Sequence, residues 1–290
     1  MRVAVHDGSF HADDVFAVAI LQKVFDDLEV VRTRDVEALA AADMRVDVGG
    51  VYNHDVMSYD HHQKEGAGER GKSIPYASAG LIWKHYGRRL VNSDKAWDYI
   101  ETKIIQPIDA SDNGVQTYDV RTLYPYTISS FVRSFNPSWQ ETDVDFDANF
   151  MKAVGVIGEL LSREFLKANG ITEAEKVVLD SIKEAKSENR LYMILKQFCP
   201  WKKTAADEDT MLYCVYQNSN GNWYVQAIPL DDESFDNRKS LPESWAGLGG
   251  EQLQEISGVE DAIFCHRMRF LCAAKSFEGA IALVEKAIAE

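Results

Sequence analysis

Residues 2–25 have the sequence RVAVHDGSFHADDVFAVAILQKVF, and this stretch decides the predicted fold. Residues 2–6 alternate between apolar and polar side chains, which is typical of a strand. Residues 12–25 carry a broad apolar stripe at helical spacing, with acids in the first turn. We therefore predict a strand, a short loop and a helix, with His6 at the end of the strand.

Two further strands are predicted after this helix. The β-branched residues at 30–31 indicate one, and the run RVDVGG at 45–50 indicates the other. Helices are predicted over residues 78–90 and 94–108. Strands that alternate with helices favour a parallel sheet covered on both faces, so the N-terminal part is expected to be an α/β/α domain.

The second half of the chain changes character. One long helix is predicted over residues 145–169, stopped by Gly170, and TEAE at 172–175 fits a capping box that begins another helix. Later patterns predict a hairpin, two strands and a final helix, over residues 211–217 with 223–230, 262–266, 268–274 and 276–289. We therefore predict an N-terminal domain, a helical middle and a smaller α+β domain, over residues 1–140, 141–190 and 191–290.

The composition narrows the class of protein. A formal charge of −15 argues against a non-specific coat on nucleic acid, because such binding depends on cations that meet phosphates. The spacing of the four cysteines matches no zinc pattern, which favours reduced thiols. No run approaches the roughly 18 apolar residues of a membrane span, and no signal or transit segment is recognised, so we expect a cytoplasmic protein.

Histidines and aspartates gather at or just after the predicted strand ends. They are His6, His11, Asp13, Asp47, Asp60, His61 and His62. Taken singly, each has an ordinary structural explanation, such as a capping acid or a hydrogen-bonded core histidine. In open α/β sheets, however, ligands bind at the carboxyl ends of strands, so these separate stretches would meet in one crevice.

Such a cluster has a defined chemistry. Imidazole and carboxylate suit Mn²⁺, Fe²⁺, Co²⁺ and Zn²⁺, and this mixture matches a site for two divalent ions. One aspartate can bridge the ions, and water held between them becomes a hydroxide that attacks phosphorus in line with the leaving oxygen. The residues by themselves therefore predict phosphoester hydrolysis, with Mn²⁺ as the expected metal and Mg²⁺, Co²⁺ or Zn²⁺ as alternatives.

Seven motifs span nearly the whole chain: HDGSFHADD, VDVGGVYNHDVMSYDHHQ, SAGLIWKHYG, IDASDNG, FNPSW, CPWK and ISGVEDAIFCH. Their order resembles the DHH phosphoesterase superfamily and, more narrowly, the melanocyte-proliferating-gene (MYG) family of metal-dependent hydrolases. The resemblance implies one metal ion held by His6, His11 and Asp47, and a second held by Asp13, Asp47, His61 and an acid of IDASDNG. It also implies that Asp60 orients an imidazole and that His62 donates a hydrogen bond to the substrate phosphate.

The IDASDNG motif offers two acids, Asp109 and Asp112, which share a helix face if the helix continues that far. We favour Asp112 as the ligand because it precedes Asn113 and Gly114 at a predicted loop. Asp109 would then support a metal ligand or cap the helix. His11 departs from most of the superfamily, which has aspartate at that position, so this metal site is expected to be less negative.

Substrate contacts are expected from the second half, because the resemblance implies a C-terminal domain that closes over the metals. An aromatic ring next to a cation is a suitable grip on a base and its phosphate. The candidates are Trp201, Lys202, Lys203, His266, Arg267 and Arg269. The alternating residues 267–270 are equally typical of a half-buried strand. The glycine- and histidine-rich phosphate loop of many superfamily members is not recognisable, and Lys275 with the start of the last helix is the alternative anion site.

The resemblance implies a 3′-to-5′ exonuclease that acts on RNA or short single strands. A narrow charged cleft that admits a single chain end would reconcile this activity with the acidic composition. Two alternatives stay open: a small-molecule phosphatase or pyrophosphatase, and a metal-stabilised regulatory protein without turnover. The exposed edge of the hairpin-rich C-terminal domain would allow a homodimer.

Overall fold

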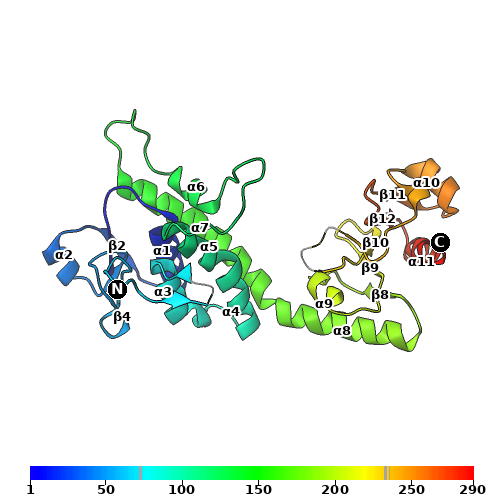
Figure 1. Cartoon of the computed structure of the whole chain (residues 1–290), viewed down its shortest axis with the longest axis horizontal. Helices are drawn as coiled ribbons and strands as arrows, with labels where there is room; N and C mark the ends of the chain where they lie inside the picture. Colours follow the sequence, from blue (N-terminus) through cyan, green and yellow to red (C-terminus); the bar gives the residue numbers. More distant parts are fainter. Residues whose placement is uncertain (72–73, 232–233, 235) are drawn as a thin grey trace. The chain divides into compact units, whose positions relative to one another are not determined.

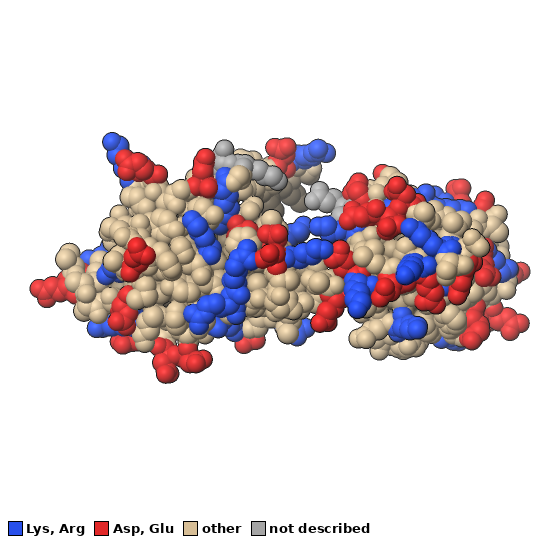
Figure 2. Space-filling model, turned by 90° about the horizontal axis from the view of Figure 1, so that it is seen from below, with Lys and Arg blue, Asp and Glu red and all other residues tan. Residues whose placement is uncertain are grey.

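The structure is a computed structural model, and it describes residues 1–71, 74–231, 234 and 236–290 (Figure 1). These residues form two compact units, Met1–Gly170 and Ile171–Glu290. The two long helices, α7 (Phe146–Asn169) and α8 (Ile171–Ser187), belong to different units. On the face drawn in Figure 2, acidic and basic side chains lie interspersed on both units.

A five-stranded sheet organises the first unit. Four of its strands are parallel and the last is antiparallel. In sheet order they are β2 (Glu29–Arg32), β1 (Arg2–Val5), β3 (Met44–Val46), β5 (Ser58–Tyr59) and β4 (Tyr52–Asn53). This arrangement confirms the α/β fold with a parallel sheet, and it brings the carboxyl ends of β1, β3 and β5 to one edge.

Helix α1 (Ala12–Val24) lies buried between the sheet and other helices, chiefly α3 (Ser78–Tyr86) and α7. Val3 and Val5 of β1 face this main core, whereas Ala4 faces the other side. There it packs in a small cluster with Val48 and with Leu39 of α2 (Val36–Ala40). The sheet therefore has one deeply covered face and one thinly covered face.

A continuous helical path runs from Asp94 to Asp112. It consists of α4 (Asp94–Ile100), a π-helical turn (Glu101–Ile105) and α5 (Gln106–Asp112). The helix predicted over 94–108 therefore exists and extends further. Smaller elements that the sequence patterns did not predict include α2, α6 (Ile128–Arg133), the strand pair β6 (Glu69–Arg70) and β7 (Ile74–Pro75), and the 3₁₀ turn His54–Val56. The 3₁₀ turn Gly87–Arg89 lies within the helix predicted over residues 78–90.

The second unit is also built on a five-stranded sheet. Its order is β11 (Ala262–Cys265), β12 (Leu271–Ala274), β10 (Trp223–Ala227), β9 (Tyr213–Gln217) and β8 (Tyr192–Leu195). Only the β8–β9 pair is parallel. Core residues of α8 and α9 (Lys202–Ala206) pack on one face, and those of α10 (Gly250–Ser257) and α11 (Phe277–Ala289) on the other, together with the 3₁₀ turn Glu243–Trp245. This confirms the smaller α+β part.

Two local predictions for the second half are wrong. Helix α8 begins at Ile171, directly after Gly170, so TEAE lies inside the helix and not at its cap. Strand β12 begins at Leu271, because residues 267–270 form a tight turn in which Arg269 has φ +57°. The predicted β9–β10 hairpin is present, and it lies inside the sheet.

In the part of the chain that the structure describes, no helix combines the length and apolar character needed to cross a bilayer.

Candidate metal centre

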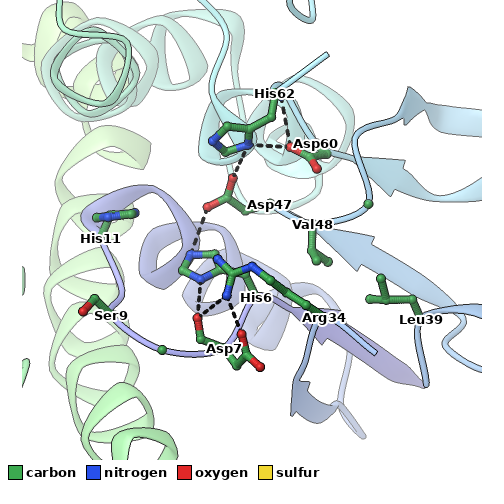
Figure 3. Close-up of a pocket in the computed structure, with 12 residues that line it drawn as sticks. His6, Asp7, Ser9, His11, Arg34, Leu39, Asp47, Val48, Asp60 and His62 are labelled. Atoms are coloured by element: carbon green, nitrogen blue, oxygen red, sulfur yellow. Dashed lines mark hydrogen bonds and ion pairs between the residues drawn. The ribbon is translucent and has the colours of Figure 1, made fainter. Parts of the chain in front are cut away.

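The predicted polar residues of the first unit meet at the carboxyl edge of its sheet. His6 follows β1, Asp47 follows β3, and the triplet 60–62 follows β5. His11 and Asp13 stand at the N-terminus of α1, which begins at the same edge. Figure 3 shows Asp47 between His6 and His62. The parallel topology therefore gathers residues that are far apart in the sequence.

Asp47 lies at the centre of this arrangement. Its Oδ2 is 3.4 Å from His6 Nε2, and its Oδ1 is 3.5 Å from His61 Nε2 and 3.4 Å from His62 Nδ1. The residue adopts a left-handed backbone conformation, with φ +54°. Gly49 and Gly50 follow with φ +97° and +67°, which a residue with a Cβ adopts at a cost. This turn points the buried carboxylate into the site.

Three overlapping groups of residues could each hold a metal ion. They are His6, His11 and Asp47; Asp47, His61 and His62; and Asp13, His61 and Asp112. Within each group the ligand atoms lie within 4.8 Å of one another. Asp47 and His61 each belong to two groups, so the arrangement suits two neighbouring ions that share ligands.

His61 provides the test of whether these residues fit a cation. Its Nε2 is buried and lies 3.1 Å from Asp112 Oδ2, 3.5 Å from Asp47 Oδ1 and 3.9 Å from Asp13 Oδ2. None of these contacts has hydrogen-bond geometry, and the atom has no hydrogen-bond partner among the described residues. A buried nitrogen without a hydrogen bond, surrounded by three carboxylates, fits a divalent ion.

His6 is oriented by groups that the sequence patterns only partly revealed. Its Nδ1 lies 3.0 Å from the carbonyl oxygen of Asp7, which fixes the proton on Nδ1 and leaves Nε2 as the ligand atom. Nε2 is 2.9 Å from Oδ2 of Asp14, a fully buried carboxylate. The other oxygen of Asp14 accepts hydrogen bonds from the backbone of His11 and Val15. From the sequence, Asp14 is only one of the acids in the first turn of the predicted helix.

Asp13 is fixed by the start of α3. Its two carboxylate oxygens accept backbone hydrogen bonds from Ser78 at 2.9 Å and Ala79 at 2.6 Å. The Ser78 hydroxyl also donates to Asp47 Oδ1 at 3.3 Å. Because free N–H groups at a helix N-terminus favour negative charge, α3 supports two acids of the site. The motif SAGLIWKHYG begins at Ser78, but no role for Ser78 or Ala79 was predicted from it.

Asp60 and His62 form a second pair. The Asp60 carboxylate lies 2.8 Å from His62 Nδ1 and accepts the His62 backbone N–H at 3.1 Å and the Gly50 N–H at 2.5 Å. The His62 side chain is 63% exposed, whereas that of Asp60 is buried. Asp60 therefore orients the ring and leaves the other ring nitrogen of His62 accessible.

The two acids of α5 have different surroundings. Asp112 lies beside His61, while Asp109 is fully buried against Arg70, with Arg70 Nη1 at 2.5 Å and the Gly80 N–H at 3.0 Å. Arg70 also contacts Glu101. Burial raises the pKa of Asp109 to about 7, although Arg70 opposes the shift. Asp109 thus joins α3, α5 and the π-helical turn through Arg70.

The charges of the site are strongly coupled. Burial lowers the pKa of His6 and of His61, but the neighbouring carboxylates raise these pKa values to about 10 and about 11. Burial tends to raise the pKa of Asp47, yet its contacts with His6 and His61 hold that pKa below its usual range. Burial and the charges of Asp47 and Asp112 raise the pKa of Asp13. In the metal-free protein, protons on the imidazoles therefore balance the carboxylates.

Two cavities open onto this centre. One of about 670 Å³ is bordered by His6, His11, Asp47 and His62 (Figure 3), and one of about 210 Å³ by His11, Asp13, His62 and Asp112. His11 and His62 line both cavities. The centre is therefore accessible from solvent although most of its acids are buried.

The candidates of the second unit have varied surroundings. Trp201 is 2% exposed and lies in the core, because α9 packs against the sheet, which does not fit the stacking role predicted for it. Lys202 and Lys203 begin α9 and are exposed. His266, Arg267 and Arg269 lie in the β11–β12 turn, where Arg269 contacts the carbonyl oxygen of Leu241. A substrate role for these residues stays a prediction.

Comparison with known families agrees with these motifs. The family model MYG1_exonuc, described as "Uncharacterised protein family (UPF0160)", matches residues 2–288. The chain belongs to the MYG1 family. A MYG1 protein of Caenorhabditis elegans is 33% identical over 322 aligned positions, which cover 99% of this chain and 94% of the relative. The human and rat proteins named MYG1 exonuclease are each 30% identical, and the matches cover all of this chain and 86% and 85% of theirs. No solved structure matches the chain.

Replacing Gly80 with alanine is expected to destabilise the first unit by about 3 kcal/mol. A Cβ at this position would meet Asp109 Oδ2 at 1.8 Å, and both partners are buried. Urea unfolding of the wild type and of the Gly80→Ala variant measures the change in the free energy of unfolding. Gly155→Ala in α7 is the matched control, because a Cβ there meets nothing within 4 Å, and helix propensity alone should raise stability by up to about 1 kcal/mol. Equal effects of the two substitutions would contradict the packing argument.

Metal binding is expected to release protons from His6 and His61 even at about pH 8. Their raised pKa values keep both imidazoles protonated in the metal-free protein, whereas a ligating imidazole must be neutral. The apparent affinity should therefore still rise with pH above neutrality. Calorimetric titration with Mn²⁺, in two buffers that differ in ionisation enthalpy, measures the release. Histidines with the ordinary pKa of 6.5 would release almost no protons at this pH. That result would contradict the raised pKa values of His6 and His61.

The same shifts affect the metal-free fold. A histidine whose pKa is raised on folding stabilises the folded state fully below its ordinary pKa of 6.5. This stabilisation is lost as the pH rises through about 10, the raised pKa of His6.

Proposed function

We propose that this chain is a divalent-metal-dependent phosphodiester hydrolase, a 3′-to-5′ exonuclease that acts on RNA or short single strands. One observation carries the proposal: Asp47 and His61 are shared between groups of residues that could hold neighbouring ions. The relatives named MYG1 exonuclease, matched over all of this chain and 85% and 86% of their own length, support a nuclease-type hydrolase. The motif order supports a place in the DHH superfamily.

The proposed ligands follow the geometry. His6, His11 and Asp47 would hold one ion, and Asp13, Asp47, His61 and Asp112 the other. When bound, two such ions, with Mn²⁺ the expected metal, lower the pKa of a coordinated water and polarise the phosphoryl group. Asp109 is assigned a supporting role, because Arg70 and Gly80 already occupy its carboxylate.

The chain's own side chains have separate tasks in this proposal. Asp13 and Asp47 are held by Ser78 and Ala79 of α3, so their carboxylates are in place before an ion binds. Asp60 orients His62, whose accessible nitrogen would donate a hydrogen bond to a phosphate oxygen as charge develops there. Asp14 orients His6. These roles divide metal binding from substrate contact.

The proposal predicts Mn²⁺-dependent, stepwise shortening of a 5′-labelled RNA from its 3′ end. The assay compares this RNA, a DNA of the same sequence and pyrophosphate as substrates. Asp47→Ala should abolish hydrolysis and lower Mn²⁺ occupancy at both positions, because the proposal assigns Asp47 to both ions and the residue belongs to two of the possible metal groups. His62→Ala should keep Mn²⁺ bound, as measured by calorimetry, and lose about a hundredfold or more in rate.

Other outcomes of this assay are equally informative. Phosphate release from pyrophosphate alone would replace the exonuclease with a small-molecule pyrophosphatase. If no metal-dependent hydrolysis of any substrate occurs although Mn²⁺ binds, the enzyme proposal is rejected. Full activity of His62→Ala would refute the role given to that histidine. Full Mn²⁺ occupancy of both metal positions in Asp47→Ala would refute the assignment of Asp47 to both ions.

A further inference from the structure

The larger cavity beside the metal centre has a wall that the proposed chemistry does not use. At one end the cavity of about 670 Å³ is bordered by the candidate ligands and at the other by Leu39 and Val48, and the Arg34 guanidinium reaches Asp7 beside His6 (Figure 3). Small-ligand pockets have volumes of about 300–1,000 Å³. The cavity is thus large enough to hold a small organic group next to a phosphate at the centre.

The apolar part of this wall is fixed by the fold. Val48 follows Asp47 directly and is 6% exposed, and Leu39 lies on α2. Both belong to the small cluster on the thinly covered face of the sheet, which also contains Ala4 and Ala42. The wall is therefore packed from behind, and its position relative to Asp47 is set by the β3 backbone.

Arg34 supplies the positive charge of the wall. It follows β2 by two residues, and its Nη1 contacts both the carbonyl oxygen, at 2.6 Å, and the carboxylate of Asp7. Its other guanidinium nitrogens have no hydrogen-bond partner within the described residues, and the side chain is 59% exposed. Among the residues that line this cavity, Arg34 is the one lysine or arginine. Asp7 orients the guanidinium without using all its donors.

Cation, apolar wall and metal ligands together match one chemical class. A guanidinium binds phosphate oxygens through charge-assisted hydrogen bonds, and an apolar surface covers a nucleobase. The acidic chain lacks the overall positive charge that would hold a strand non-specifically. Recognition of a single nucleotide in this cavity does not need an overall positive charge.

We propose that this cavity is a subsite for one nucleotide of the substrate, the nucleotide whose phosphate lies at the metal centre. Arg34 contacts a phosphate oxygen of this nucleotide, and Leu39 and Val48 pack against its base. This inference rests on the proposed function, because it assumes a nucleic-acid substrate. It places the substrate contact in the first unit, beside the metal ligands.

Binding of two probes to the Mn²⁺-loaded full chain tests this subsite without hydrolysis. Adenosine 5′-monophosphate carries both the phosphate and the base, whereas ribose 5-phosphate lacks the base. Arg34→Ala is expected to weaken both probes by about tenfold or more, with the Mn²⁺ affinity unchanged. Calorimetry measures all three affinities.

Leu39→Ala separates the apolar wall from the cation. It should weaken adenosine 5′-monophosphate by about fivefold and leave ribose 5-phosphate unaffected, because only the base meets this side chain. Arg88→Ala is the matched control: Arg88 is also exposed and paired with one aspartate, Asp94, but it does not line the cavity. It should bind both probes like the wild type.

Several results would overturn the subsite. The first is failure of the wild type to bind adenosine 5′-monophosphate. The second is equal affinity of Arg34→Ala and the wild type for both probes. The third is a loss of probe affinity in Arg88→Ala as large as that in Arg34→Ala. Equal wild-type affinity for the two probes would remove the base contact. If the wild type hydrolyses RNA but the substitutions leave binding unchanged, the subsite fails and the proposed function stands. If adenosine 5′-monophosphate binds and Arg34→Ala weakens this binding, but the wild type hydrolyses no RNA, the subsite stands and the proposed function fails.

Discussion

Four of the buried carboxylates around the candidate metal centre are the constraint on which the rest of the first unit depends. Asp13, Asp14, Asp47 and Asp109 are each at most 4% exposed. Buried acids repel one another and lose hydration, so each needs a partner. Asp13 has the start of α3, Asp14 has His6 and backbone N–H groups, Asp47 has two imidazoles, and Asp109 has Arg70. The candidate metal centre is the region where this compensation is shared.

The scaffold around these acids follows from their needs. The left-handed turn at Asp47 is continued by two glycines, and Gly80 leaves the space that the Asp109 carboxylate occupies. Arg70 contacts both Asp109 and Glu101 and so connects the β6–β7 pair to the helical path. A centre that is charge-balanced by protons in the absence of metal is suited to exchange those protons for divalent ions. Substrate recognition can then be local, since the ions themselves supply positive charge.

Much of the fold was predictable because its signals are local. The alternation of β1, the stripe of α1, the long helix α7 and the β9–β10 hairpin all depend on neighbouring residues. Short elements such as α2, β5 and β8 escaped prediction, because tertiary contacts and not their own pattern stabilise them. The turn at residues 267–270 was read as strand since alternation in a short segment does not distinguish the two.

The sequence by itself determined which residue types stand at the strand ends, and their combination of imidazoles and carboxylates predicted a two-metal chemistry. The tertiary structure decided how those residues divide the work. Asp109 and Asp112 have the same chemistry in one motif, but only Asp109 faces Arg70 and Gly80, which lie far away in the sequence. Trp201 is buried and Arg34 lines the cavity for the same reason. The partner of a side chain depends on elements that meet only after folding, and no local pattern contains that information.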